Sequence, residues 1–323
     1  MRAHVPGSSR CLPFLTACTA AIFAAPELST PQVQHDVPVL YRGPENTDLP
    51  LEAPAAAASR AGAPSSTTEA PRTSDDAETI ETDRPDFTDS PRTVPAGLVQ
   101  LETGYTLERR RSEEFTSVTH SFGEPLLRIG LSRSLELRLA AAPVLERVTE
   151  GTKVTETWAN EFLLLGTKVA LGSQRGLRPS RALLVESVLP TAGEADPIGD
   201  GTFRLALLYA WDLSPRWSIG GSSHVEYSPG KNFPEQTVLI QSITSGWDLG
   251  SGLGAYLEWF AFQPLGPAGG GGEHYLNGGF TYLARERVQL DVRVGRGLTT
   301  SAADFFFGVG LSIRSKPIIS LFP

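Results

Sequence analysis

Residues 80–108, IETDRPDFTDSPRTVPAGLVQLETGYTLE, decide how the chain folds. The first half of this stretch is polar, acidic and rich in proline, and from Leu98 onward apolar and polar residues alternate. Because successive side chains of a β-strand point to opposite faces, the alternation predicts a strand with one apolar and one polar face. The apolar face would carry Val99, Leu101, Tyr105 and Leu107, and the polar face Gln100, Glu102, Gly104 and Thr106.

The composition of the 323-residue chain excludes several classes of protein. The net charge of -8 argues against nucleic-acid binding, which needs a basic surface. Both cysteines, Cys11 and Cys18, precede residue 20, so the rest of the chain can build no disulfide framework, zinc site or cysteine nucleophile. The 32 glycines and 25 prolines favour turns over long helices.

The first 79 residues have the composition of targeting and linker segments. Residues 1–25 contain arginines and the apolar run CLPFLTACTAAIFAA, which is typical of a signal peptide and too short to span a membrane as a helix. Lipidation of Cys18 is an open alternative. Residues 26–79 are rich in Ala, Pro, Ser, Thr and acidic residues and poor in core-forming ones, so we expect a disordered linker.

The period of two recurs as far as Arg314 and predicts about twelve strands of roughly ten residues each. Strands of that length, tilted by about 45°, match the apolar band of an outer-membrane barrel. After the first strand, the clearest predicted strands are 135–140, 162–171, 203–211, 288–295 and 305–314. Weaker ones are 118–131, 181–190, 217–227, 236–247, 253–262 and 274–283.

Long and short connections between these strands mostly alternate. Longer polar connections are expected at 109–117, 143–157 and 191–199, and tight turns at 132–134 and 212–216. Long outer loops and short periplasmic turns are typical of membrane barrels. With the export signal and the aromatic residues near strand ends, the pattern predicts an all-β, transmembrane, antiparallel up-and-down barrel over residues 98–314. Residues 315–323 would form a C-terminal tail.

Charge is confined to one face of the predicted strands. Because a basic side chain facing mid-bilayer lipid costs about 2–4 kcal/mol, the charged face is expected to line the lumen. Residues predicted to face lipid include Leu137, Leu205, Leu290 and Val309. Residues predicted to face the lumen include Glu102, Arg128, Glu136, Arg138, Lys168, Glu186, Arg204, Glu226, Glu258, Asp291, Arg293 and Arg314.

Three blocks of the sequence carry a resemblance to a known family. The first runs from Thr-Asp-Arg-Pro-Asp at 82–86, through Val94, Pro95 and Gly97, to Gln-x-Glu-x-Gly at 100–104. The others are LLRIGLSRSLELRL at 126–139 and QLDVRVGRGLTTSAADFFFGVGLSIR at 289–314. Over about residues 80–314 the chain resembles the outer-membrane "transporter" barrels of the MetA-pathway of phenol degradation family. The resemblance implies uptake of aromatic or other small hydrophobic compounds.

The end of the chain departs from the usual pattern of such barrels. They often finish on an aromatic residue that the barrel-insertion machinery reads, whereas this chain ends SKPIISLFP, with Phe322 second from last. Either the tail or an internal phenylalanine would then serve the insertion machinery.

The segment at 80–97 cannot face lipid, because its charges would meet hydrocarbon and its prolines remove ladder donors. It is expected in the lumen or the periplasm. As a luminal latch, Arg84 would pair with an inward acid, and Asp83 and Asp86 with luminal arginines. The candidate acids are Glu102, Glu136, Glu258 and Asp291.

Two other interpretations of this segment remain open. It could be a solvated periplasmic lead-in that caps the first strand. Asp83, Asp86 and Asp89 could also bind a cation, although their spacing does not match an EF-hand loop.

The sequence predicts no enzyme, cofactor or metal site. His35 falls in the linker, and the other histidines of the mature chain fall on different strands. Ser223 and His224 are adjacent strand residues and would point to opposite faces, which does not make a catalytic triad.

The leading functional prediction is a passive channel for small molecules across the outer membrane, with luminal charge setting its selectivity. The alternative is a structural or binding barrel whose inward acids and bases pair with one another and fill the lumen. The expected partners are outer-membrane lipid, a small molecule that the sequence does not identify, and the insertion machinery.

Overall fold

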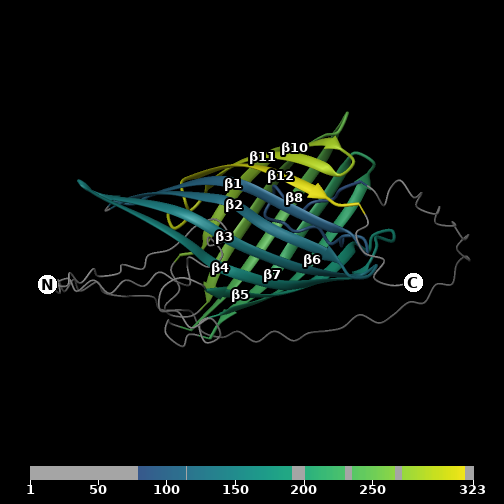
Figure 1. Ribbon diagram of the computed structural model, residues 1–323, viewed down its shortest axis with the longest axis horizontal. Coiled ribbons are helices and arrows are strands. Elements are labelled where there is room, and N and C mark those ends of the chain that lie inside the picture. The colour runs from purple at the N-terminus through teal and green to yellow at the C-terminus, as the bar shows by residue number, and fades with distance from the viewer. Residues whose placement is uncertain (1–78, 114, 191–200, 230–234, 266–270, 317–323) are drawn as a thin grey trace, which may run out of the picture.

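The computed structural model describes residues 79–113, 115–190, 201–229, 235–265 and 271–316, which form β-strands and no helix (Figure 1). No helix in these ranges is long and apolar enough to cross a membrane. The predicted signal peptide, the Cys18 alternative, the linker up to residue 78 and residues 317–323 of the tail lie outside the described residues. The strands are β1 (Val99–Arg111), β2 (Thr116–Gly130), β3 (Leu135–Glu150), β4 (Lys153–Gly172), β5 (Ser180–Pro190), β6 (Thr202–Ser214), β7 (Trp217–Ser228), β8 (Gln236–Gly250), β9 (Leu253–Leu265), β10 (Glu273–Arg285), β11 (Val288–Gly297) and β12 (Phe305–Arg314).

These strands close into one antiparallel barrel. Each strand pairs with its neighbours in sequence, and β1 pairs with β12, with Gln100 opposite Arg314 and Arg109 opposite Phe305. Closure leaves no strand edge with unpaired main-chain groups, which is what a sheet needs in order to span lipid. The predicted all-β, up-and-down barrel of about twelve strands is confirmed.

Side-chain burial alternates along the strands. On β6, Leu205 exposes 51% of its surface, whereas its neighbour Arg204 exposes 8%. Apolar side chains therefore cover the outer wall and charged ones line the interior, which is the arrangement of a membrane barrel. On the outer wall, Leu290 and Val309 are exposed and Leu137 is half-buried; inside, Arg138, Asp291 and Arg293 are buried.

One predicted loop is instead a strand hairpin. The expectation of a polar loop at 143–157 is wrong, because β3 continues to Glu150 and β4 begins at Lys153. The hairpin turns at Gly151, whose φ of 57° suits glycine. Its valines and threonines favour strands, and a strand that extends into water needs no apolar face. For the same reason β4 reaches 20 residues rather than the expected ten or so.

The ladders that join β1 to β4 shift register at neighbouring positions. In β2, Gly123 and Glu124 adopt positive φ angles of 73° and 35°, and Pro125 has no N–H to give to the ladder. At this bulge the side chain of Glu124 is buried inside the barrel. Strict alternation along the strand cannot predict that direction.

An apolar cluster covers one part of the luminal wall. Its rings come from Phe260 and Phe262 of β9, Tyr275 of β10 and Phe306 of β12. The ring of Phe87, which lies inside the barrel, stacks on Phe260 with 4.7 Å between centroids. The lumen therefore has an aromatic wall as well as a charged one.

Candidate functional site

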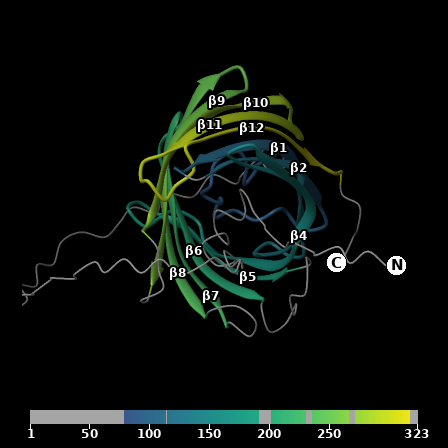
Figure 2. The same ribbon diagram turned by 90° about the vertical axis from the view of Figure 1, so that its left-hand side faces the viewer.

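Residues 80–97 run through the interior of the barrel, as Figure 2 shows in a view into its open end. We call residues 80–97 the plug. Its first N–H group, on Ile80, donates to the carbonyl of Glu286 at 2.6 Å, and its last, on Gly97, donates to the carbonyl of Gly130 at 2.9 Å. Main-chain hydrogen bonds thus hold both ends of the plug to the barrel.

Three glutamates of the barrel wall accept hydrogen bonds from the main chain of the plug. Hydrogen bonds to a charged acceptor are stronger than neutral ones, and these do not depend on the side chains of the plug. They are Asp83 N–H (3.1 Å) and Arg84 N–H (3.1 Å) to Glu102, Phe87 N–H (2.7 Å) and Thr88 N–H (2.7 Å) to Glu258, and Val94 N–H (2.7 Å) to Glu136.

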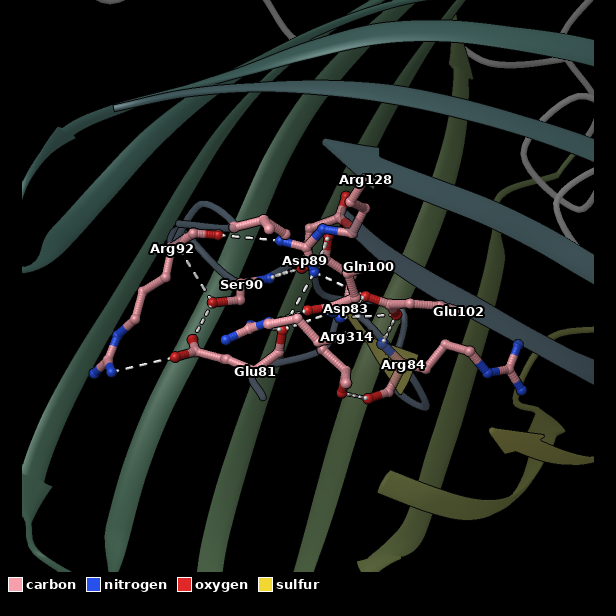
Figure 3. Close-up of polar contacts among 12 residues, drawn as sticks. Glu81, Asp83, Arg84, Asp89, Ser90, Arg92, Gln100, Glu102, Arg128 and Arg314 are labelled. Atoms are coloured by element: carbon pink, nitrogen blue, oxygen red, sulfur yellow. Dashed lines mark hydrogen bonds and ion pairs between the residues drawn. The ribbon is translucent and has the colours of Figure 1, made fainter. Parts of the chain in front are cut away.

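Asp83 is the centre of a buried ionic network (Figure 3). Its carboxylate contacts Lys168 at 2.8 Å, Arg128 at 3.2 Å and the guanidinium of Arg138. Burial alone would raise the pKa of Asp83, but these three cations outweigh burial and hold the pKa well below its usual range. The same carboxylate accepts the N–H of Ser90 at 3.0 Å, which closes the plug into a compact turn.

Arg84 points away from this network and into a second acidic pocket. Its guanidinium lies 2.7 Å from Glu124 and 3.4 Å from Asp291. Burial lowers the pKa of Arg84, but the two carboxylates more than compensate and raise it above its usual value. A Cβ atom at Gly104 or Gly310 would collide with this guanidinium, so both glycines form the slot that admits it.

The buried carboxylates of Asp86 and Asp89 have fewer neighbouring positive charges to stabilise their ionised form than the carboxylate of Asp83. Burial and the neighbouring Glu258 raise the pKa of Asp86 well above its usual range. Among the described residues Asp86 forms no ion pair, so the structure does not bring it to a luminal arginine as the latch hypothesis expected. Asp89 lies 3.1 Å from Arg138, but that guanidinium also contacts three other carboxylates. Burial therefore still raises the pKa of Asp89, to about 6.

The remaining predicted residues line the lumen with different partners. Arg204 bridges Glu186 at 3.0 Å and Glu226 at 2.5 Å. Arg293 donates to the carbonyl of Pro85 at 3.0 Å. Arg128 bridges Glu102 and Glu136, each at 2.8 Å.

Sequence reasoning missed some of the plug contacts. Glu124 is the nearest partner of Arg84 but was not a candidate, because a bulge reverses its direction. Lys168 and Glu186 were placed on the inward face without a role in the latch, and Asp89 was considered only as a cation ligand. Their charge on an inward face was the available signal, but no sequence pattern indicates which inward charge meets which plug residue.

The two other interpretations of the segment fit the structure less well. The plug lies in the lumen rather than leading into β1 from outside (Figure 2). In the part of the chain that the structure describes, no three His, Cys, Asp or Glu side chains group as a metal-binding set. The carboxylate of Asp83, central to the cation hypothesis, is instead occupied by lysine and arginine.

Three cavities border the plug. The first, which we call the central chamber, has a volume of about 140 Å³ and is lined by Phe87, Arg138 and His224 among others. A second, of about 160 Å³, lies between the plug and β6–β8. The third, of about 630 Å³, opens among the tight turns at one end of the barrel. Asp86 is common to the linings of all three.

The barrel is similar to solved structures of outer-membrane channels. An outer membrane channel from Pseudomonas putida F1 superposes with a TM-score of 0.57 at 12% sequence identity, covering 73% of this chain and 100% of that one. The CymD monoaromatic hydrocarbon channel gives a TM-score of 0.41 at 10% identity, covering 69% of this chain and 89% of that one. At 12% identity the first of these likenesses shows the fold alone. Among curated proteins, none matches the chain.

A family model covers most of the chain and includes both the plug and the barrel. It matches residues 82–315, from Thr82 beside the Asp83 network to Ser315, which follows β12. The three sequence blocks that resembled this family all fall inside the match. The chain therefore belongs to the family described as "Putative MetA-pathway of phenol degradation".

Proposed function

We propose that this protein is a passive channel of the outer membrane for small aromatic or otherwise hydrophobic molecules, with the plug setting the width of the passage. The observation that carries the proposal is the arrangement of the barrel: an apolar outer wall, a charged lumen, and cavities on more than one side of a plug that no covalent cross-link fixes. Solutes would pass between the plug and the wall, by way of the region around Asp86.

The aromatic wall supports the choice of solute. Phe260, Phe262, Tyr275 and Phe306 form a continuous cluster of rings inside the barrel, and Phe87 of the plug extends it to the central chamber. Aromatic rings offer favourable stacked and edge-to-face contacts to other rings, worth about 0.5–1.5 kcal/mol each beyond area burial. Such a wall would favour flat apolar solutes over sugars or ions.

The proposal is tested with the full chain refolded into lipid. In planar bilayers we expect small discrete conductance steps. In vesicles whose outer leaflet is lipopolysaccharide, which slows the passage of apolar solutes, we expect faster entry of toluene or phenol than into protein-free vesicles. If correctly folded protein gives neither conductance nor any increase in solute entry, the channel proposal is wrong.

A closed, structural or binding barrel is the second candidate, and one observation favours it. The luminal charges are largely paired with one another, as in the chain of contacts from Asp83 through Arg138 to Glu186 and on to Arg204. A self-neutralised network of this kind fills a lumen and stabilises it. Ligand binding without conductance or solute entry would favour this candidate.

The proposal includes export of the chain and insertion of the barrel into the outer membrane. The N-terminal residues 1–25 would act as the signal that directs the chain across the inner membrane. The insertion machinery would then place the barrel in the outer membrane, where exposed residues such as Leu205 and Leu290 would contact lipid.

A further inference from the structure

A chain of hydrogen bonds runs from the wall of the central chamber to the plug. His224 Nε2 lies 2.7 Å from Ser222 Oγ, which lies 2.7 Å from Ser242 Oγ. Ser242 Oγ lies 2.6 Å from Thr88 Oγ1, and Thr88 Oγ1 donates to Glu258 Oε1 at 2.7 Å. The chain thereby connects β7 and β8 with the plug and β9.

The carboxylate at the end of this chain acts only as an acceptor. Glu258 receives the main-chain N–H groups of Phe87 and Thr88, the hydroxyl of Thr88 and the amide N–H of Asn277, at distances of 2.7 to 3.0 Å. Four donors converge on its two oxygens, which suits the ionised form, because a protonated acid would bring a fifth donor.

One proton per hydroxyl then fixes the direction of every link. Thr88 gives its proton to Glu258, so Ser242 must donate to Thr88, and Ser222 must donate to Ser242. Ser222 has no proton left for the imidazole, so Nε2–H of His224 donates to Ser222. The chain selects the Nε2–H tautomer, and Nδ1 keeps its lone pair.

The Nδ1 atom of His224 is a buried acceptor with no hydrogen-bond partner among the described residues. The side chain of His224 lines the central chamber, and His224 exposes only 5% of its surface. Its Nδ1 atom has almost no accessible surface, so a solute in the chamber reaches it only when a neighbouring side chain moves. The ring of Phe87, whose centroid lies 6.0 Å from that of the imidazole, is one such neighbour. An unmade hydrogen bond at a buried polar atom is unfavourable, so a ligand that donates to Nδ1 would be favoured there.

The size and apolar lining of the chamber suit a single ring. A cavity of about 150 Å³ is known to hold benzene, and the chamber has a volume of about 140 Å³. Phe87, Leu126, Ala140 and Leu164 give it apolar surface next to the polar groups. A ligand with a small apolar body and one polar group would match this lining.

The charges around His224 restrict which polar group the solute can carry. The chamber is lined both by arginines, including Arg138 and Arg204, and by carboxylates, including Asp86 and Glu186. A solute of either charge would therefore meet groups of like charge there. A carboxylate carries no proton to donate to Nδ1. A neutral hydroxyl can donate without either penalty.

We propose that His224 is a specificity-determining residue, whose Nδ1 atom accepts a hydrogen bond from a neutral, ring-sized solute that carries a hydroxyl group. As an account of solute selection the proposal rests on the channel function proposed above, whereas the binding itself can be measured separately. Thr88 acts as a positioning residue, because its hydroxyl orients the chain that fixes the tautomer.

The first test reads the imidazole directly. The full chain, labelled with ¹⁵N-histidine, is refolded in detergent micelles, and the signals of His224 are identified by their loss in His224→Gln. We expect the Nε2–H tautomer. Phenol and cyclohexanol should shift the Nδ1 signal in a saturable way, and toluene should not. An Nδ1–H tautomer, or equal responses to phenol and toluene, would overturn the proposal.

Two matched pairs of measurements separate recognition from folding. The affinity for phenol should fall about five- to tenfold in His224→Leu, the loss expected for one neutral hydrogen bond, while the affinity for toluene stays unchanged. Thr88→Val should allow the second tautomer to appear, whereas Thr88→Ser should retain the single tautomer. If both Thr88 variants keep one tautomer, the proposed hydroxyl chain is wrong. If His224→Leu does not fold, the comparison of phenol with toluene on the unmodified chain decides.

The outcome is distinguishable from that of the channel experiment. Phenol binding at His224 without conductance or solute entry supports this inference and removes the channel function. If conductance and solute entry are observed without any preference for hydroxylated rings, the channel proposal is supported and the proposed role of His224 is wrong.

Discussion

The guanidinium of Arg84 lies 2.7 Å from the carboxylate of Glu124, which β2 presents at a bulge with a φ of 35°. The plug and an irregularity of the barrel wall therefore depend on each other. A regular β2 would not offer this carboxylate at that point, and without Arg84 the buried carboxylate would lose its nearest cation.

Removing Arg84 should loosen the plug. Arg84→Ala leaves Glu124 and Asp291 buried without their shared partner, which should cost about 3 kcal/mol or more and raise single-channel conductance. In Arg84→Ala/Glu124→Ala the loss should be smaller than the sum of the two single losses. Urea unfolding and bilayer recordings would measure both effects. Strict additivity of the two substitutions would show that the pair is not coupled.

The main-chain anchor at Glu258 gives a second test. Glu258→Ala removes the acceptor of the Phe87 and Thr88 N–H groups and should increase conductance with little change in the outer barrel. Glu258→Gln keeps one acceptor oxygen and should have a smaller effect. Hydrogen exchange at residues 87 and 88 would report the freed amides. Equal protection of these amides in all three proteins would contradict the anchor.

Neighbouring residues on β6 test which wall faces lipid. Leu205→Arg should cost about 2–4 kcal/mol of barrel stability, because the new charge meets lipid, with Leu205→Met as the control. The sequence alone predicts a smaller cost for Arg204→Leu. The bridge from Arg204 to Glu186 and Glu226 raises that expectation to about 3–5 kcal/mol.

Rescue distinguishes these two losses of stability. Adding Glu226→Gln should recover part of the stability lost in Arg204→Leu, because one uncompensated charge is removed. The same addition should not help Leu205→Arg. Recovery in both backgrounds would mean that Glu226→Gln stabilises the barrel by itself and that the rescue does not report the Arg204–Glu226 pair.

Asp89 should make stability depend on pH. Burial raises its pKa from 3.8 to about 6, so the fold favours the neutral acid. That stabilisation is complete below pH 3.8 and is lost as the pH rises through about 6. Relative to Asp89→Asn, the unmodified protein should lose up to about 2–3 kcal/mol between pH 4 and pH 7.

Urea unfolding of both proteins across this pH range would measure the difference. Asp83, whose pKa is lowered, changes stability in the opposite sense and only below its ordinary value of 3.8, so it does not mask the effect. Parallel curves for the two proteins would show that folding does not shift the pKa of Asp89.

The fold could be predicted from the sequence because one physical constraint acts on almost every strand residue. Leu205 and Arg204 must face opposite media, so their alternation is visible in the sequence. The hairpin at 143–157 was misassigned because that constraint ends at the membrane surface. Beyond it, Arg147 and Glu156 face water on a strand and resemble loop residues.

The site could be predicted only in outline. The charges of Asp83 and Arg84 excluded a lipid-facing strand and indicated the lumen, but the contacts depend on three-dimensional register. Glu124 became a partner through a bulge, and Asp86 met Glu258 rather than an arginine. In the sequence, Gly104 is recognisable only as part of a motif. The structure gives the reason for it, because the guanidinium of Arg84 occupies the space that a Cβ atom at position 104 would need.

Arg314, on the last strand, donates to Gln100 on the first at 2.8 Å and to the main-chain carbonyl of Thr79 at 2.8 Å, directly before the plug. Joining the two ends of the sheet and seating the internal segment are therefore coupled steps of assembly. A folding intermediate in which β12 has not met β1 would leave residues 79–97 accessible to proteases. Cleavage of residues 79–97 during refolding should therefore stop when the barrel closes. The protease resistance of this segment would then report that assembly is complete.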